Sequence, residues 1–169
     1  MIRIAIVSPY TLPFYCGNSL LAERLRSELS CRGHRVCVFN SSGDAQREVS
    51  AFSPDIIHSL HAVKTYTWLE KFYSDGAVPL VVTLTGTDYN TSRKEKGFLE
   101  KLSRSLALAA AIVVFHDEAF SLVTSGFKDV SKKIHIVPQG VRAASAPFER
   151  NSHRQARGLK NGDVVFLMT

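Results

Sequence analysis

Two adjacent residues near the start of the chain have the types and the position to bind an anion. Gly17 and Asn18 end a loop that follows a strand-like run and directly precede leucines at helical spacing. A helix N-terminus offers free backbone N–H groups and the positive end of the helix dipole. We therefore predict that Gly17 and Asn18 contact the phosphates of a nucleotide. The same residues also fit a simple turn in which Asn18 caps the helix.

Two histidines occur where a second strand-like run ends. His58 and His61 belong to the segment DIIHSLHA at residues 55–62. An imidazole can bind a sugar hydroxyl or act beside a developing charge, because its pKa can be set on either side of neutrality. His61 lies further beyond the strand and is the stronger functional candidate. Structural, hydrogen-bonded histidines are the alternative for both.

A third polar segment follows another apolar run. Residues 84–90 read LTGTDYN and place Thr85, Gly86, Thr87 and Asn90 around the carboxylate of Asp88. Hydroxyl, amide and carboxylate groups are the donors and acceptors used in sugar recognition, and a carboxylate can also accept a proton. We predict a sugar or acceptor site here. An Asx-type turn held by Asp88 or Asn90 is the alternative.

Composition excludes several classes of protein. The 169 residues are 45% apolar and 21% charged, which is typical of a globular domain. The longest apolar run, at residues 106–115, is shorter than the roughly 20 residues of a membrane-spanning helix. The N-terminal residues lack the pattern of a secretory signal, and the three cysteines include no CxxC pair. These features predict a cytoplasmic protein without disulfides or a metal site.

The charge predicts anionic partners without choosing among them. The net charge is +6 and the pI is about 9.4, which suits nucleotide phosphates, acidic lipids or nucleic acid. Basic residues gather at positions 93–104 and could face an anionic membrane, although such runs are usually solvated helix faces. The motifs GxGxxG, GxxxxGK[ST], HExxH and GxSxG do not occur.

Strand-like and helix-like segments alternate along the chain, and this alternation must position the polar segments. The predicted strands are residues 2–7, 35–39, 55–59, 80–85, 112–115 and 134–137. The predicted helices are residues 18–32, 45–52, 63–73, 94–108 and 118–125.

This alternation predicts a Rossmann-like, doubly wound α/β domain. We expect about six to seven parallel strands with helices on both faces, because parallel neighbours need crossover connections. Ligands of such sheets bind beyond the carboxyl ends of the strands. All three polar segments follow predicted strands, so we expect them at one edge of the sheet.

The end of the chain predicts a second domain. Residues 1–142 form the expected Rossmann-like domain, residues 143–163 an interdomain linker, and residues 164–169 the first strand of a C-terminal donor-binding domain. An edge strand of the first domain is the alternative for the last segment.

The ordered motifs resemble the N-terminal half of a two-domain GT-B glycosyltransferase, similar to glycosyltransferase family 4. The resemblance is carried by CGN at residues 16–18, GHRV at 33–36, PDIIH at 54–58 and IVPQGV at 136–141. The LHA segment at 60–62 and LTGTD at 84–88 are similar to a less-studied subgroup of that family. The order and spacing of these pieces span nearly the whole chain.

The resemblance implies the acceptor-side domain of a retaining enzyme that uses a nucleotide diphosphate sugar and no metal. It implies that Gly17 and Asn18 face the donor diphosphate. His61 and Asp88 would then be the catalytic candidates that hydrogen-bond the reacting hydroxyl. The implied partners are the nucleotide sugar, a hydroxyl acceptor and the enzyme's own C-terminal domain. Peripheral contact with the anionic inner face of a membrane is a further possibility. Nucleic acid is not an expected partner. The isolated fragment is expected to be inactive.

Three positions depart from the family pattern. The sequence has Cys16 where the family often has a glycine, Thr85 where it has a histidine, and Gln139 where it has an asparagine. The second departure removes the histidine near the acceptor, and His61 could replace it. Two other classes remain open: half of a GT-B sugar epimerase, and a stand-alone flavodoxin-like binding or regulatory module.

Overall fold

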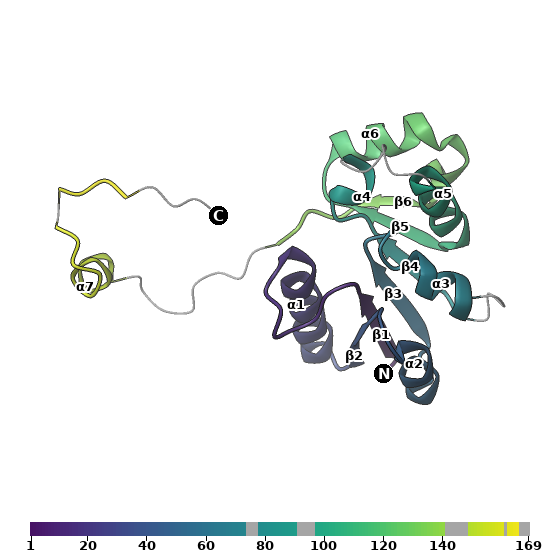
Figure 1. Ribbon diagram of the computed structural model, residues 1–169, viewed down its shortest axis with the longest axis horizontal. Helices are drawn as coiled ribbons and strands as arrows, with labels where there is room; N and C mark the ends of the chain where they lie inside the picture. The colour runs from purple at the N-terminus through teal and green to yellow at the C-terminus, as the bar shows by residue number, and fades with distance from the viewer. Residues whose placement is uncertain (74–77, 91–96, 141–148, 161, 166–169) are drawn as a thin grey trace. The chain divides into compact units, whose positions relative to one another are not determined.

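The computed structural model describes residues 1–73, 78–90, 97–140, 149–160 and 162–165. By its internal contacts the chain divides into two compact units, Met1–Pro138 and Gln139–Thr169. The first unit carries the sheet (Figure 1), and its range includes all the predicted site residues.

A parallel six-stranded sheet forms the centre of the first unit. Its strands are β1 (Arg3–Ser8), β2 (Arg35–Asn40), β3 (Ile56–Leu60), β4 (Leu80–Thr83), β5 (Ala111–Val114) and β6 (Ile134–Ile136). Their order is β2-β1-β3-β4-β5-β6, and every neighbouring pair is parallel. All six predicted strands are confirmed, and the fold is the predicted doubly wound α/β class.

Helices cover both faces of this sheet. They are α1 (Gly17–Cys31), α2 (Ala45–Phe52), α3 (Tyr66–Phe72), α4 (Thr87–Asn90), α5 (Phe98–Leu108), α6 (Asp117–Gly126) and the 3-10 helix η1 (Lys128–Lys133). Helix α1 packs on β1 and β2 with Ile4, Ile6 and Leu21. Helices α2, α3, α5 and α6 contribute to the larger core on the other face (Figure 1).

Local sequence explains helix α1. Its leucine stripe turns toward the sheet: Leu21 is buried, and Leu25 and Leu29 pack beside it. The helix ends at Cys31, and Gly33 follows with a φ of 85°, a left-handed conformation that favours glycine. The predicted helix and its stop are therefore confirmed.

Two helices begin later than their periodicity predicts. Helix α3 begins at Tyr66 rather than residue 63, because residues 61–65 form a hydrogen-bonded turn after β3. Helix α5 begins at Phe98, after Gly97 with a φ of 80°, whereas the prediction began at residue 94; residues 91–96 lie outside the described part. Helices α4 and η1 were not predicted.

The second unit contains one described helix, α7 (Arg150–Gln155). It lies inside the predicted linker 143–163, so that linker is not without regular structure. Val164 and Val165, the first residues of the predicted last strand, are exposed and outside any strand. Residues 141–148 and 166–169 lie outside the described part, so the domain boundary at 142 and the strand of a second domain stay predictions.

Candidate functional site

The predicted site residues follow β1, β3 and β4, at the edge of the sheet where the strand order reverses between β1 and β3. The chain leaves β1 toward β2 on one side, whereas it leaves β3 toward β4 on the other. Such a reversal opens a crevice beyond the carboxyl ends of the two strands, which is where ligands of doubly wound sheets bind. The loop before α1 and the turn before α3 flank this position.

His61 is the first residue after β3 and is held in an unusual backbone conformation. Its φ is 72°, in the left-handed region that side chains rarely adopt, and its side chain is only 3% exposed. Its Nδ1 accepts a hydrogen bond from the Lys64 N–H at 3.2 Å, and its Nε2 lies 3.0 Å from the Thr87 hydroxyl. Backbone strain of this kind persists only where surrounding contacts determine the conformation.

Burial sets the charge of the His61 ring, and the two hydrogen bonds set its tautomer. Burial, assisted by the nearby Lys64 charge, lowers its pKa to about 4, so the ring is neutral at physiological pH. Because Nδ1 accepts a hydrogen bond, the proton lies on Nε2, which donates to Thr87. The Asp88 carboxylate is 3.9 Å from Nδ1 and forms no ion pair with this neutral ring.

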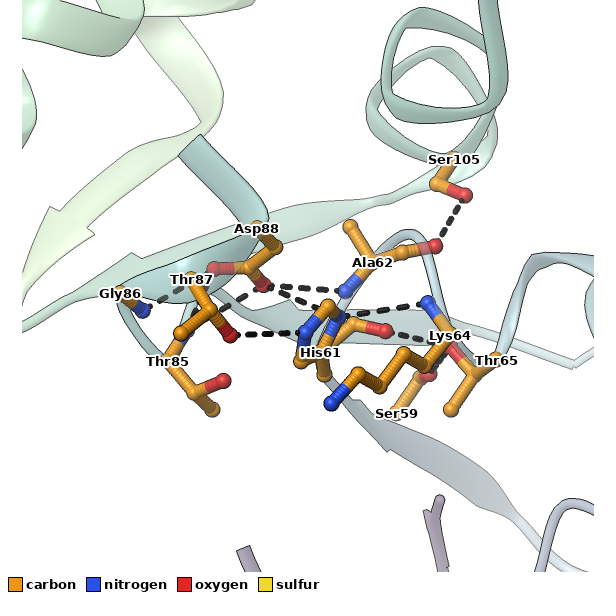
Figure 2. Close-up of polar contacts among 10 residues, drawn as sticks. All are labelled: Ser59, His61, Ala62, Lys64, Thr65, Thr85, Gly86, Thr87, Asp88 and Ser105. Atoms are coloured by element: carbon orange, nitrogen blue, oxygen red, sulfur yellow. Dashed lines mark hydrogen bonds and ion pairs between the residues drawn. The ribbon is translucent and has the colours of Figure 1, made fainter. Parts of the chain in front are cut away.

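Asp88 ties two loops together from inside. Its side chain is fully buried, and its carboxylate accepts backbone N–H bonds from Ala62 at 3.1 Å, Thr85 at 2.9 Å and Gly86 at 3.0 Å (Figure 2). Burial raises its pKa to about 6, and the same N–H groups limit the rise. With its oxygens occupied and shielded, Asp88 is a positioning residue, and this replaces the sequence-based interpretation that it touches the reacting hydroxyl.

Further hydrogen bonds fix the turn at residues 61–65. The hydroxyls of Ser59 and Thr65 lie 2.7 Å apart, and Thr65 also donates to the carbonyl of His61 at 3.0 Å. Ser105 on α5 donates to the Ala62 carbonyl at 2.8 Å. The turn is therefore held from β3, from α5 and from Asp88 (Figure 2).

The predicted sugar-binding residues form the outer layer of this cluster. Thr85 and Gly86 are half-buried, whereas Thr87 and Asn90 are exposed. Gly86 has a φ of 111°, which lets the chain turn sharply from β4 into α4. In Figure 2 the Thr85 hydroxyl points to the side of the His61–Thr87 pair opposite Asp88. Hydroxyls at the surface above a buried polar anchor are suited to bind a hydroxylated ligand.

Helix α1 begins one residue earlier than predicted, and its N-cap is Cys16 rather than Asn18. The Ser19 hydroxyl accepts the Cys16 backbone N–H at 3.0 Å. Burial raises the pKa of the Cys16 thiol, but hydrogen bonds from Ser19 and Asn18 and the charge of Lys64 outweigh it, so the pKa lies below its ordinary value. Gly17 is exposed and occupies the first helical position.

Lys64 is the site residue that sequence reasoning missed. Its ammonium lies 5.0 Å from the centre of the Tyr10 ring, across from the β1–α1 loop. It is close enough to shift the pKa of both Cys16 and His61. The available signal was compositional: within segments 9–16, 61–65 and 84–86, Lys64 is the only lysine, arginine or carboxylate residue.

His58 lies on β3 and contacts the neighbouring strand β4. The His58 ring is 2.7 Å from the Thr83 hydroxyl, and burial lowers its pKa to about 4, which fits a structural histidine. Within the described ranges, no three His, Cys, Asp or Glu side chains are grouped so that they could hold a metal ion. Over the same residues, no helix has the length and apolar character to cross a membrane.

The basic segment proposed to face a membrane is only partly described. Residues 91–96 lie outside the described part. Arg104 on α5 pairs with Glu100 at 2.8 Å and Glu70 at 3.5 Å, so its charge is compensated locally. Lys101 is exposed on the same helix.

Comparison with known proteins leaves the family open. No protein-family model matches the chain. Among solved structures, the chain is similar to a point mutant of flavodoxin from Pseudomonas aeruginosa, with 14% sequence identity and a TM-score of 0.38 over 92% of this chain and 93% of that chain. The fold class therefore follows from this chain's own strand order and connections.

Proposed function

We propose that this chain is the acceptor-side domain of a retaining glycosyltransferase that uses a nucleotide diphosphate sugar. The observation that carries the proposal is a shared position. The exposed N-terminus of α1 follows β1, at the topological switch point between β1 and β3, and the anchored hydroxyl segment at residues 85–87 follows β4, the neighbour of β3, at the same edge of the sheet. The first group suits a diphosphate and the second suits a sugar.

In the proposed reaction, the bond between the anomeric carbon and the diphosphate oxygen breaks, and the electron pair leaves with the diphosphate. A new bond forms between that carbon and the acceptor oxygen, whose proton passes to the departing phosphate. Negative charge develops on the diphosphate, so preorganised N–H donors such as that of Gly17 stabilise this step. Thr85 and Thr87 contact the sugar or the acceptor.

His61 and Asp88 act in this proposal through other groups. The neutral His61 ring donates to Thr87 and so orients that hydroxyl. The Asp88 carboxylate holds the Thr85 and Gly86 backbone in place. Both are therefore positioning residues, and the outer hydroxyls are the groups that touch the ligand.

Replacing Gly17 with proline tests the diphosphate contact without removing the helix. Proline lacks the N–H but is favoured at the first helical position, and Cys16 before it is already extended, with φ −154° and ψ 173°. Space for a side chain is open at Gly17. We expect Gly17→Pro to weaken binding of UDP-glucose or GDP-mannose about tenfold, the effect of losing one charge-assisted hydrogen bond.

The matched control is Gly17→Ala, which keeps the N–H. Binding is followed by amide shifts of Asn18, Thr85 and Gly86 in the 15N-labelled chain, with β6 as a distant reference. Equal affinity of the proline and alanine variants would show that the Gly17 N–H contacts no phosphate. An absence of shifts at this edge with every nucleotide sugar would overturn the proposed function.

The proposal also requires a donor-binding domain. We expect the coding sequence to continue past Thr169 into a second βα domain with a basic pair and an E-x7-E segment. A stop codon at that point would contradict the transferase proposal for this polypeptide. The proposed setting is the cytoplasm, with an anionic membrane surface as a further partner.

The strand order favours one second candidate, a flavodoxin-like binding module. The order β2-β1-β3-β4-β5 is that of flavodoxin-like sheets, whose flavin mononucleotide binds at the β1/β3 switch point. Titration with flavin mononucleotide separates the two candidates. Quenching of flavin fluorescence with tighter binding than any nucleotide sugar would support the module over the transferase.

A further inference from the structure

Lys64 is an exposed lysine in the turn between β3 and α3. None of the ion pairs among the residues that the structure describes includes Lys64. The surrounding segments 9–16, 61–65 and 84–86 contain no aspartate or glutamate. The Asp88 carboxylate, 3.9 Å from the His61 ring, accepts hydrogen bonds from backbone N–H groups. Lys64 is therefore a cation at this edge of the sheet whose charge no ion pair among the described residues neutralises.

The position of Lys64 is set by the structure around it. Its backbone N–H is bonded to the buried His61 ring, and the next residue, Thr65, is tied to Ser59. Its ammonium rests against the Tyr10 ring at 5.0 Å, a cation–π contact, and the residue is exposed to solvent. In Figure 2 its side chain extends to the side of His61 opposite Asp88, the side to which the Thr85 hydroxyl also points.

Among the described residues, the side chains around Lys64 do not offer a second positive charge at this position. His61 is neutral, and both its ring nitrogens are engaged in hydrogen bonds. The influence of Lys64 on Cys16 places its charge within electrostatic range of the residue before α1. One ammonium thus acts on both sides of the switch point, between the loop before α1 and the turn before α3.

We propose that Lys64 binds a phosphate group of the ligand at this edge, an inference that rests on the proposed function. The phosphate could belong to the donor diphosphate or to a phosphorylated acceptor. A lysine ammonium binds phosphate as a compact point charge with rotatable donors, so it can serve a phosphate from either source.

The test compares Lys64→Gln with Lys64→Arg and with Lys132→Gln in the 15N-labelled chain at low ionic strength. Lys132 is also an exposed lysine, in η1 just before β6, and therefore at the amino end of a strand and at the opposite edge of the sheet. The probes are UDP for the donor, glucose 6-phosphate for a phosphorylated acceptor, and glucose as its neutral counterpart. We expect Lys64→Gln to weaken at least one phosphate-bearing probe about tenfold, while arginine retains most of the affinity and Lys132→Gln changes nothing.

The pattern of losses identifies the source of the phosphate. A loss confined to UDP assigns Lys64 to the donor, and a loss confined to glucose 6-phosphate assigns it to the acceptor. Unchanged affinity for both in Lys64→Gln, with Asn18 and Thr85 amides still responding to UDP-glucose, would overturn the Lys64 inference alone. No response to any probe at this edge would overturn the proposed function together with it.

Discussion

Asp88→Ala should lower the free energy of unfolding by about 3 to 5 kcal/mol, because it leaves several buried N–H groups without a partner. The carboxylate is the acceptor for Ala62, Thr85 and Gly86, which come from two different loops. Relief of the buried charge offsets part of the loss. Equilibrium unfolding in urea, followed by circular dichroism, measures the change.

The control for this substitution is Asp44→Ala. Asp44 is exposed and its side chain makes no capping hydrogen bond to α2, so its loss should change stability by less than about 0.5 kcal/mol. A similarly small effect for Asp88→Ala would mean that water replaces the carboxylate and that the loops do not depend on it. In a folded Asp88→Ala variant, the amide signals of residues 61–65 and 85–87 should broaden.

Acidification from pH 6 to pH 4 should destabilise the domain by about 3 kcal/mol through three buried groups. The pKa values of His58 and His61 are lowered to about 4, so in this range the two rings are mostly protonated in the unfolded chain and mostly neutral in the folded chain. The pKa of Asp88 is raised to about 6, so the folded state binds one proton that the unfolded chain does not. The net difference is one proton, or about 1.4 kcal/mol per pH unit.

The pKa shift of Asp88 changes stability with pH in the opposite direction to the shifts of the two histidines, and this provides a control. In Asp88→Asn the carboxyl no longer titrates, so the two histidines act alone and the slope should rise to about 2.7 kcal/mol per pH unit. Urea unfolding at a series of pH values measures both slopes, and the ring signals of His58 and His61 report their charge directly. Stability that increases toward pH 4 would contradict the assignment of neutral, buried histidines.

Sequence periodicity located the elements because it reports which side chains face a core. The six strands and the helices α1, α2 and α6 lie within about two residues of their predicted bounds. The exceptions have tertiary causes. Residues 63–65 have helical spacing, but Thr65 and Ala62 are bonded to Ser59 and Asp88, and these contacts hold the chain in a turn.

For the site, too, sequence predicted some features and tertiary contacts decided others. Because the carboxyl ends of parallel strands meet at one edge, sequence was enough to expect His61 and residues 85–88 near each other, and the structure places His61 and Thr87 in contact at 3.0 Å. Residue type alone did not indicate which of these side chains are exposed and which are buried. Asp88 proved to be buried in N–H bonds, and Lys64 proved to lie against Tyr10.

What the sequence determined by itself was the alternation of strands and helices, the fold class and the edge at which to look for a site, since all three follow from patterns within short segments. The tertiary structure decided the strand order, the strained turn at His61 and the roles of Asp88 and Lys64. The reason is physical: those roles depend on burial and on hydrogen bonds between residues far apart in the chain, such as the 26 positions that separate Ala62 from Asp88.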